Sequence, residues 1–183
     1  MKQSMVCVLS LLVMGCAIDP AGPSAWRGKV TQQLPLLGHR NWIVIADSAY
    51  PWQTSPGIET IYTNAGQIEV VACVLDAVRK APHVRPIIYT DAELKFVPEE
   101  NAPGIGAYRD QLKEILGDAD VQSLPHEEII AKLDEAGSTF HVLLLKTVLT
   151  LPYTSVFLQL DCGYWSAEAE QQLREAIPFV VTP

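Results

Sequence analysis

The sequence predicts an α/β domain with a central sheet flanked by helices, and three observations support this class. Short, nearly continuous apolar runs, typical of strands covered on both faces, alternate with longer segments whose apolar residues recur at helical spacing. Strands that alternate with helices in this way are typical of α/β domains. The chain has 183 residues, of which 49% are hydrophobic and 19% charged, so it can form one substantial core. Neither an internal repeat nor a second-domain boundary interrupts the pattern.

The strands are predicted where the apolar runs fall, at residues 42–47, 85–90, 140–146 and 154–160. Helices are predicted between them, at residues 66–80, 105–116, 123–137 and 167–176. The helix at 123–137 has the clearest ends, because Ser123 suits an N-cap, Pro125 suits the first turn and Gly137 follows the last turn.

The first fifteen residues differ from the rest and are predicted to be an export signal. One lysine precedes an apolar stretch of about ten residues, which is too short to span a bilayer. Residues 13–16 resemble a bacterial lipobox, in which Cys16 is lipidated and becomes the new N-terminus. We therefore expect removal of residues 1–15, a linker at 16–33, a domain at 34–183 and a lipid anchor in the cell envelope. A plain secretory signal and a miscalled start codon before a cytoplasmic protein are the alternatives.

Charge and motif content exclude several classes of function. The net charge of −8 disfavours nucleic acid as a partner, because an acidic surface repels phosphates. The sequence has no glycine-rich phosphate loop and no metal-ligand spacing, so we expect neither a cofactor nor a metal. Cys73 and Cys162 lie in apolar contexts and are expected to be buried thiols, although export leaves a disulfide open.

Polar residues frame the first predicted strand. Gly38 and His39 precede it, Asp47 ends it, and Pro51 follows a few residues later. A histidine at such a turn is usually a solvated loop residue, and an aspartate at a strand end commonly caps the next turn. On its own, this spacing leaves structural and catalytic interpretations open.

Two further polar motifs follow in the second half of the chain. His126 stands in the first turn of a predicted helix, and Tyr153 and Ser155 precede the last predicted strand. In this order the motifs resemble those of the D-ribose pyranase and L-fucose mutarotase family, over residues 34 to about 161. The chain departs from the family at Ser155, where an asparagine is usual, and in the polar helix after Gly163, beyond the usual end of family members.

The resemblance implies a ribose pyranase-like fold and an isomerase that interconverts ring forms or anomers of a free aldose by general acid–base catalysis. It implies that His39 is the acid/base group, and that Asp47, His126, Tyr153 and Ser155 bind the monosaccharide. It also implies a homo-oligomer with sugar sites at subunit interfaces. Two alternatives stay open: a catalytically silent sugar-binding lipoprotein, and a ring-forming assembly protein of the envelope.

Replacement of Cys16 by serine tests the predicted lipid anchor. In a bacterium that processes lipoproteins, we expect the parent protein to incorporate a labelled fatty acid. The Cys16→Ser variant should lose the label, because it lacks the thiol that carries the lipid. The Cys7→Ser variant is the control and should keep it. A parent protein without label would contradict the lipobox.

Overall fold

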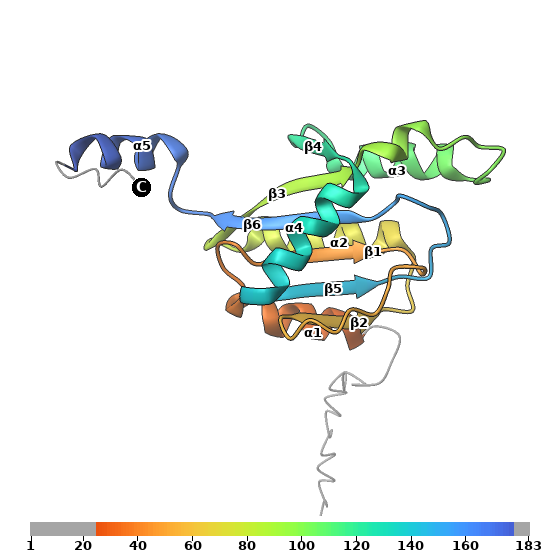
Figure 1. Ribbon diagram of the computed structural model, residues 1–183, viewed down its shortest axis with the longest axis horizontal. Coiled ribbons are helices and arrows are strands. Elements are labelled where there is room, and N and C mark those ends of the chain that lie inside the picture. The colour runs from red at the N-terminus through yellow and green to blue at the C-terminus, as the bar shows by residue number, and fades with distance from the viewer. Residues whose placement is uncertain (1–24, 178–183) are drawn as a thin grey trace, which may run out of the picture.

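A six-stranded mixed sheet forms the centre of the computed structural model, which describes residues 25–177 (Figure 1). The strands are β1 (Trp42–Ala46), β2 (Ile58–Tyr62), β3 (Val84–Asp91), β4 (Val121–Leu124), β5 (Val142–Lys146) and β6 (Val156–Cys162). The helices are α1 (Ala25–Gln33), α2 (Gln67–Lys80), α3 (Ile105–Leu116), α4 (His126–Thr139) and α5 (Ala167–Ala176), with 3₁₀ helices at Leu34–Leu36 and Ala92–Phe96. The α/β class is therefore confirmed. The predicted signal and Cys16 lie outside the described residues.

The strand directions give the sheet two different edges. The spatial order is β2-β5-β1-β6-β3-β4, and β6 alone runs antiparallel to its neighbours. The ends of the other five strands therefore lie together with the start of β6, and we call this the carboxyl edge. The starts of those five strands lie with the end of β6, and we call this the amino edge.

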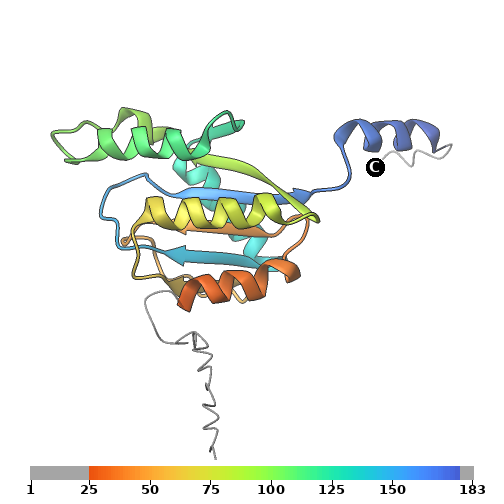
Figure 2. The same ribbon diagram turned by 180° about the vertical axis from the view of Figure 1, so that it is seen from behind.

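Helices cover both faces of the sheet. Figures 1 and 2 show α4 on one face and α1, α2 and α3 on the other. In β1, Ile43 and Ile45 pack into the cluster with α1 to α3, whereas Trp42, Val44 and Ala46 pack into the cluster with α4. All five residues of β1 are buried, which explains the continuous apolar run.

Residues 25–33, within the segment expected to be a linker, instead form α1. Trp26 and Val30 are buried in the core, four residues apart on one helical face. The rest of the helix is polar or exposed, so its hydrophobic pattern is too sparse to signal a helix. Among the described helices, none is long and apolar enough to cross a membrane.

Helix α4 begins and ends differently from the prediction. Ser123 lies in β4 and does not cap the helix, which starts at His126. The Glu93 carboxylate accepts a hydrogen bond from the His126 backbone N–H, at 3.1 Å from each oxygen, and so takes the capping role. Gly137 lies inside the helix, where an added Cβ would come within 2.7 Å of Ile58. Its role is close packing against β2.

The last helix, α5, has the predicted bounds but no buried residue. The Ser166 hydroxyl caps it by accepting a hydrogen bond from the Ala169 N–H at 3.1 Å. Figures 1 and 2 both show α5 beyond the end of β6, over neither face of the sheet. Cys73 and Cys162 are free thiols, as expected, but both are half-buried.

Gly57 is a packing constraint that substitution can test. A Cβ at Gly57 would overlap the carbonyl oxygens of Gly137 and Phe140, which are backbone atoms that cannot rotate away. We expect Gly57→Ala to lower the free energy of unfolding by about 1–3 kcal/mol in urea denaturation. Gly28→Ala is the control: a Cβ there has no neighbour within 4 Å, so the variant should be unchanged or more stable. Equal stability of the two variants would contradict this packing.

Candidate functional site

The carboxyl edge gathers polar residues from four parts of the chain. Asp47 follows β1, Asp91 ends β3, His126 begins α4 and Tyr153 precedes β6. They lie at one edge because β1, β3 and β4 are co-directional and β6 runs against them. Ligands of open α/β sheets commonly bind beyond the carboxyl ends of the strands. Asp47, His126 and Tyr153 are predicted site residues, whereas Asp91 was not predicted.

A buried carboxylate orients His126. The Asp91 Oδ1 atom lies 3.0 Å from His126 Nδ1, and the Asp91 side chain is 0% exposed against 32% for His126. An ionised carboxylate can only accept, so with Asp91 ionised Nδ1 is the donor of this hydrogen bond, and Nε2 is the nitrogen left to face a ligand. The bond from the His126 N–H to Glu93 fixes the backbone of the same residue. The imidazole is thus held in one position and one tautomer.

Tyr153 lies beside this histidine in an uncommon backbone conformation. Its φ of 56° is in the left-handed region, which costs free energy for a residue with a Cβ. The phenol ring meets the His126 imidazole edge-on, with centroids 5.6 Å apart and an interplanar angle of 84°. Tyr153 is 40% exposed, so part of the residue's surface is open to a ligand.

Two buried polar atoms near this edge lack a hydrogen-bond partner among the described residues: Asp91 Oδ2 and the Tyr50 hydroxyl. Burial raises the pKa of Tyr50, and the carboxylates of Asp134, Asp91 and Asp47 raise it further, so the phenol keeps its proton. Burial also raises the pKa of Asp91, although the hydrogen bond and charge of His126 partly oppose this effect. Buried polar groups are normally hydrogen-bonded, so two unpaired atoms cost free energy at this edge. Both atoms are buried and offer no surface to a ligand in this conformation.

Three other polar residues at this edge are hydrogen-bonded within the chain or buried. Asp47 Oδ1 accepts a hydrogen bond from the Ala49 N–H at 2.8 Å and so caps the turn after β1. Ser155 is 2% exposed and offers almost no surface to a ligand. Lys146 Nζ donates to the Tyr50 carbonyl at 2.8 Å and holds the same loop from β5. Within residues 25–177, no three His, Cys, Asp or Glu side chains are grouped to hold a metal ion.

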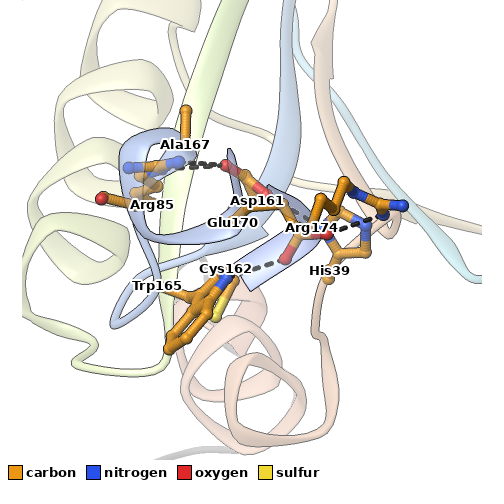
Figure 3. Close-up of a pocket in the computed structure, with 9 residues that line it drawn as sticks. His39, Arg85, Asp161, Cys162, Trp165, Ala167, Glu170 and Arg174 are labelled. Carbon is orange, nitrogen blue, oxygen red and sulfur yellow. Dashed lines mark hydrogen bonds and ion pairs between the residues drawn. The ribbon is translucent and has the colours of Figure 1, made fainter. Parts of the chain in front are cut away.

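The structure places His39 at the amino edge, away from the other predicted site residues. His39 precedes β1 and Asp47 follows it, so the strand, about 17 Å long, separates them. His39 Nδ1 lies 2.9 Å from Asp161 Oδ1, and a cavity of about 540 Å³ adjoins them (Figure 3). Trp165 and Arg174, from the C-terminal segment, line the same cavity. Within one copy of the chain, His39 and Asp47 do not share a site.

The fold is similar to that of a structure solved with a bound sugar. Bacillus subtilis RbsD, solved in complex with D-ribose, matches with a TM-score of 0.52 and 20% identity, over 73% of this chain and 91% of that one. This chain has the RbsD fold. The ribose pyranase-like fold implied by the sequence motifs is thereby confirmed.

Two further matches have TM-scores of 0.49 and 18% identity, each over 73% of this chain. One is FucU from Bifidobacterium longum, with 94% of its chain covered. The other is the fucose mutarotase from Streptococcus pneumoniae in complex with L-fucose, with 91% covered. No family model matches the sequence, and no curated protein matches it.

The raised pKa of Asp91 predicts how the Asp91→Asn substitution affects stability. A carboxyl group with a higher pKa in the folded state makes folding less favourable as pH rises through the interval between its unfolded and folded values. Asparagine lacks this penalty. From about pH 4, the unfolded value for aspartate, the free energy of unfolding of the variant should therefore rise relative to that of the parent. Urea denaturation at stepwise pH measures this difference, with Asp76→Asn as the control for loss of an exposed carboxylate. A difference that is constant or falls with pH would contradict the assignment.

Proposed function

We propose that the protein binds a free monosaccharide and interconverts its ring forms or anomers by general acid–base catalysis. The observation that carries this proposal is the His126 ring, oriented by buried Asp91 and flanked by the partly exposed Tyr153 at the carboxyl edge. The RbsD structure, which has the same fold, was solved with D-ribose bound, and this supports an aldose as the ligand class.

The chemistry requires only groups that move protons. An acid protonates the ring oxygen while a base removes the proton of the anomeric hydroxyl. The bond between the anomeric carbon and the ring oxygen then breaks, and a carbonyl group forms. Closure on the other carbonyl face, or by another hydroxyl, gives the product. Histidine suits both steps because it exchanges protons near neutral pH, and general acid–base catalysis typically contributes about 10²- to 10⁴-fold.

The carboxyl edge offers the contacts that a sugar needs. His126 Nε2 accepts a hydrogen bond from a sugar hydroxyl, and the Tyr153 ring provides an apolar face against the C–H groups of the sugar. Asp47 adds a carboxylate at the rim, although one of its oxygens already caps a turn.

We propose that His39, as the acid/base group, comes from a second copy of the chain. A monosaccharide is too short to reach both ends of β1. The groups at the two edges of one copy therefore cannot contact the same sugar molecule. A head-to-tail oligomer would place the amino edge of one copy against the carboxyl edge of the next. Such an oligomer would have its sites between subunits, as the motif resemblance implies, and assembly would be a condition for catalysis.

A second candidate function is sugar binding without turnover. The separation of His39 from the carboxyl edge within one copy favours it, since a lone copy would have a binding surface without this acid/base group. The lipobox-like residues 13–16 support the proposal that either protein is exported and anchored in the envelope.

NMR saturation transfer between the ring forms of D-ribose and L-fucose tests the main proposal. We expect the protein to raise the exchange rate for at least one aldose, and His39→Ala to lower the enhancement by about 10²-fold or more. Saturable binding without enhanced exchange would support the second candidate. Neither binding nor exchange for any aldose would contradict both.

The two histidines should differ in their effects. His126→Ala should weaken sugar affinity by about tenfold, because it removes a hydrogen bond and leaves the buried Asp91 carboxylate without its partner. His39→Ala should leave the affinity within about twofold while it lowers exchange. Calorimetric titration measures the affinities, with the half-exposed His141→Ala as the control. Equal loss of affinity in both variants would contradict these separate roles.

A further inference from the structure

At the amino edge, the carboxylate of Asp161 lies between Arg85 and His39 (Figure 3). Oδ1 is 2.9 Å from His39 Nδ1. Oδ2 accepts two hydrogen bonds from the Arg85 guanidinium, at 2.9 Å from Nε and 2.5 Å from Nη2. Each oxygen therefore has a separate partner, and the three side chains form one chain of hydrogen bonds.

The sheet itself fixes the relative positions of Arg85 and Asp161. The two residues stand directly opposite each other in the antiparallel pair of β3 and β6. Asp161 is 21% exposed; burial acts to raise its pKa, but hydrogen bonds from Arg85, the Cys162 N–H and His39 outweigh this and lower it. The carboxylate is therefore ionised at neutral pH and acts as an acceptor only.

The loop that carries His39 is tied to the same part of β6. The Gly38 N–H donates to Asn41 Oδ1 at 2.7 Å, which closes the turn on both sides of His39. Arg40 has a φ of 76°, in the left-handed region, and its N–H donates to the Leu160 carbonyl at 2.9 Å. Because Leu160 adjoins Asp161, the backbone of the loop and the acceptor of the imidazole move together.

We propose that Asp161, anchored by Arg85, is a positioning residue that keeps the proton of His39 on Nδ1 and leaves Nε2 free to exchange protons with the sugar. This inference rests on the proposed acid/base role of His39. The His39 side chain is 62% exposed, so its second nitrogen is open to a ligand. The arrangement repeats at the amino edge what Asp91 does for His126 at the carboxyl edge.

The Asp161→Asn substitution reverses this arrangement with little change in shape. Asparagine has a single carbonyl oxygen. Because Arg85 can only donate, we expect its guanidinium to donate hydrogen bonds to that oxygen. The amide NH₂ group then faces His39 Nδ1, which must accept, and the imidazole proton moves to Nε2. The variant therefore presents a donor to the sugar where the parent presents an acceptor.

Long-range ¹H–¹⁵N NMR of the His39 ring, without sugar, is the direct test. We expect the Nδ1–H tautomer in the parent and the Nε2–H tautomer in Asp161→Asn. Exchange kinetics should show kcat lower by about 10- to 100-fold, with KM within about twofold. Glu69→Gln is the matched control, because it removes the carboxylate of another exposed arginine pair, Arg27–Glu69. It should leave both the tautomer and the kinetics unchanged.

The tautomer and the kinetics distinguish failure of the positioning role of Asp161 from failure of the acid/base role of His39. An unchanged His39 tautomer in Asp161→Asn would overturn the positioning role whatever the kinetics show. A tautomer that changes while neither Asp161→Asn nor His39→Ala affects sugar exchange would contradict the acid/base role of His39 instead. If Asp161→Asn does not fold, Arg85→Gln serves as the second variant: it should mix the two tautomers, and an unmixed Nδ1–H tautomer would overturn the anchoring role of Arg85.

Discussion

The burial of β1 on both faces is the constraint on which the rest of the structure depends. Its five residues lie between β5 and β6 in the sheet and between α4 and the α1–α3 layer across it. Such a strand can present polar side chains only at its two ends. The chain places His39 before one end and Asp47 after the other, so its polar chemistry is divided between two edges of the sheet.

Both edges contain a hydrogen bond between an aspartate carboxylate and a histidine ring. At each, an aspartate at the end of a strand accepts a hydrogen bond from Nδ1 of a histidine, at 3.0 Å for Asp91–His126 and 2.9 Å for Asp161–His39. They differ in burial, since the Asp91 side chain is fully buried whereas Asp161 and His39 are partly exposed. Burial of Asp91 fixes the orientation of His126, whereas the exposure of His39 leaves its imidazole open to another molecule.

The sequence predicts the strands that carry continuous apolar runs but not the two outermost strands of the sheet, β2 and β4. β1, β5 and β6 are predictable because they are buried on both faces. Each of these two outermost strands has a neighbouring strand on one side only, and most of their residues are half-buried or exposed. Neither strand therefore has an apolar run. Helix α1 escapes prediction for a similar reason, since only Trp26 and Val30 are buried.

The candidate site is predictable only where a motif is local. The positions of Asp47, His126 and Tyr153 follow from their place at the ends of predicted elements. The roles of Asp91 and Asp161 depend on histidines 35 and 122 residues away in the sequence. Their signal is weak but present, because Asp91 is the last residue of β3 and Asp161 the last but one of β6. Ser155 shows the converse: its place in a motif predicts contact with the sugar, but it is buried.

Complementation between two impaired variants, assayed at sugar concentrations well below KM, tests most directly whether the two edges act together. His39→Ala lacks the group of the amino edge, and His126→Ala lacks that of the carboxyl edge. If sites form between copies, an equal mixture assembled into common oligomers has both groups intact in about a quarter of its sites. We predict that the mixture recovers about that fraction of the parental sugar exchange. A mixture no more active than the average of the two variants measured separately, with mixed oligomers verified by mass spectrometry, would contradict a shared site.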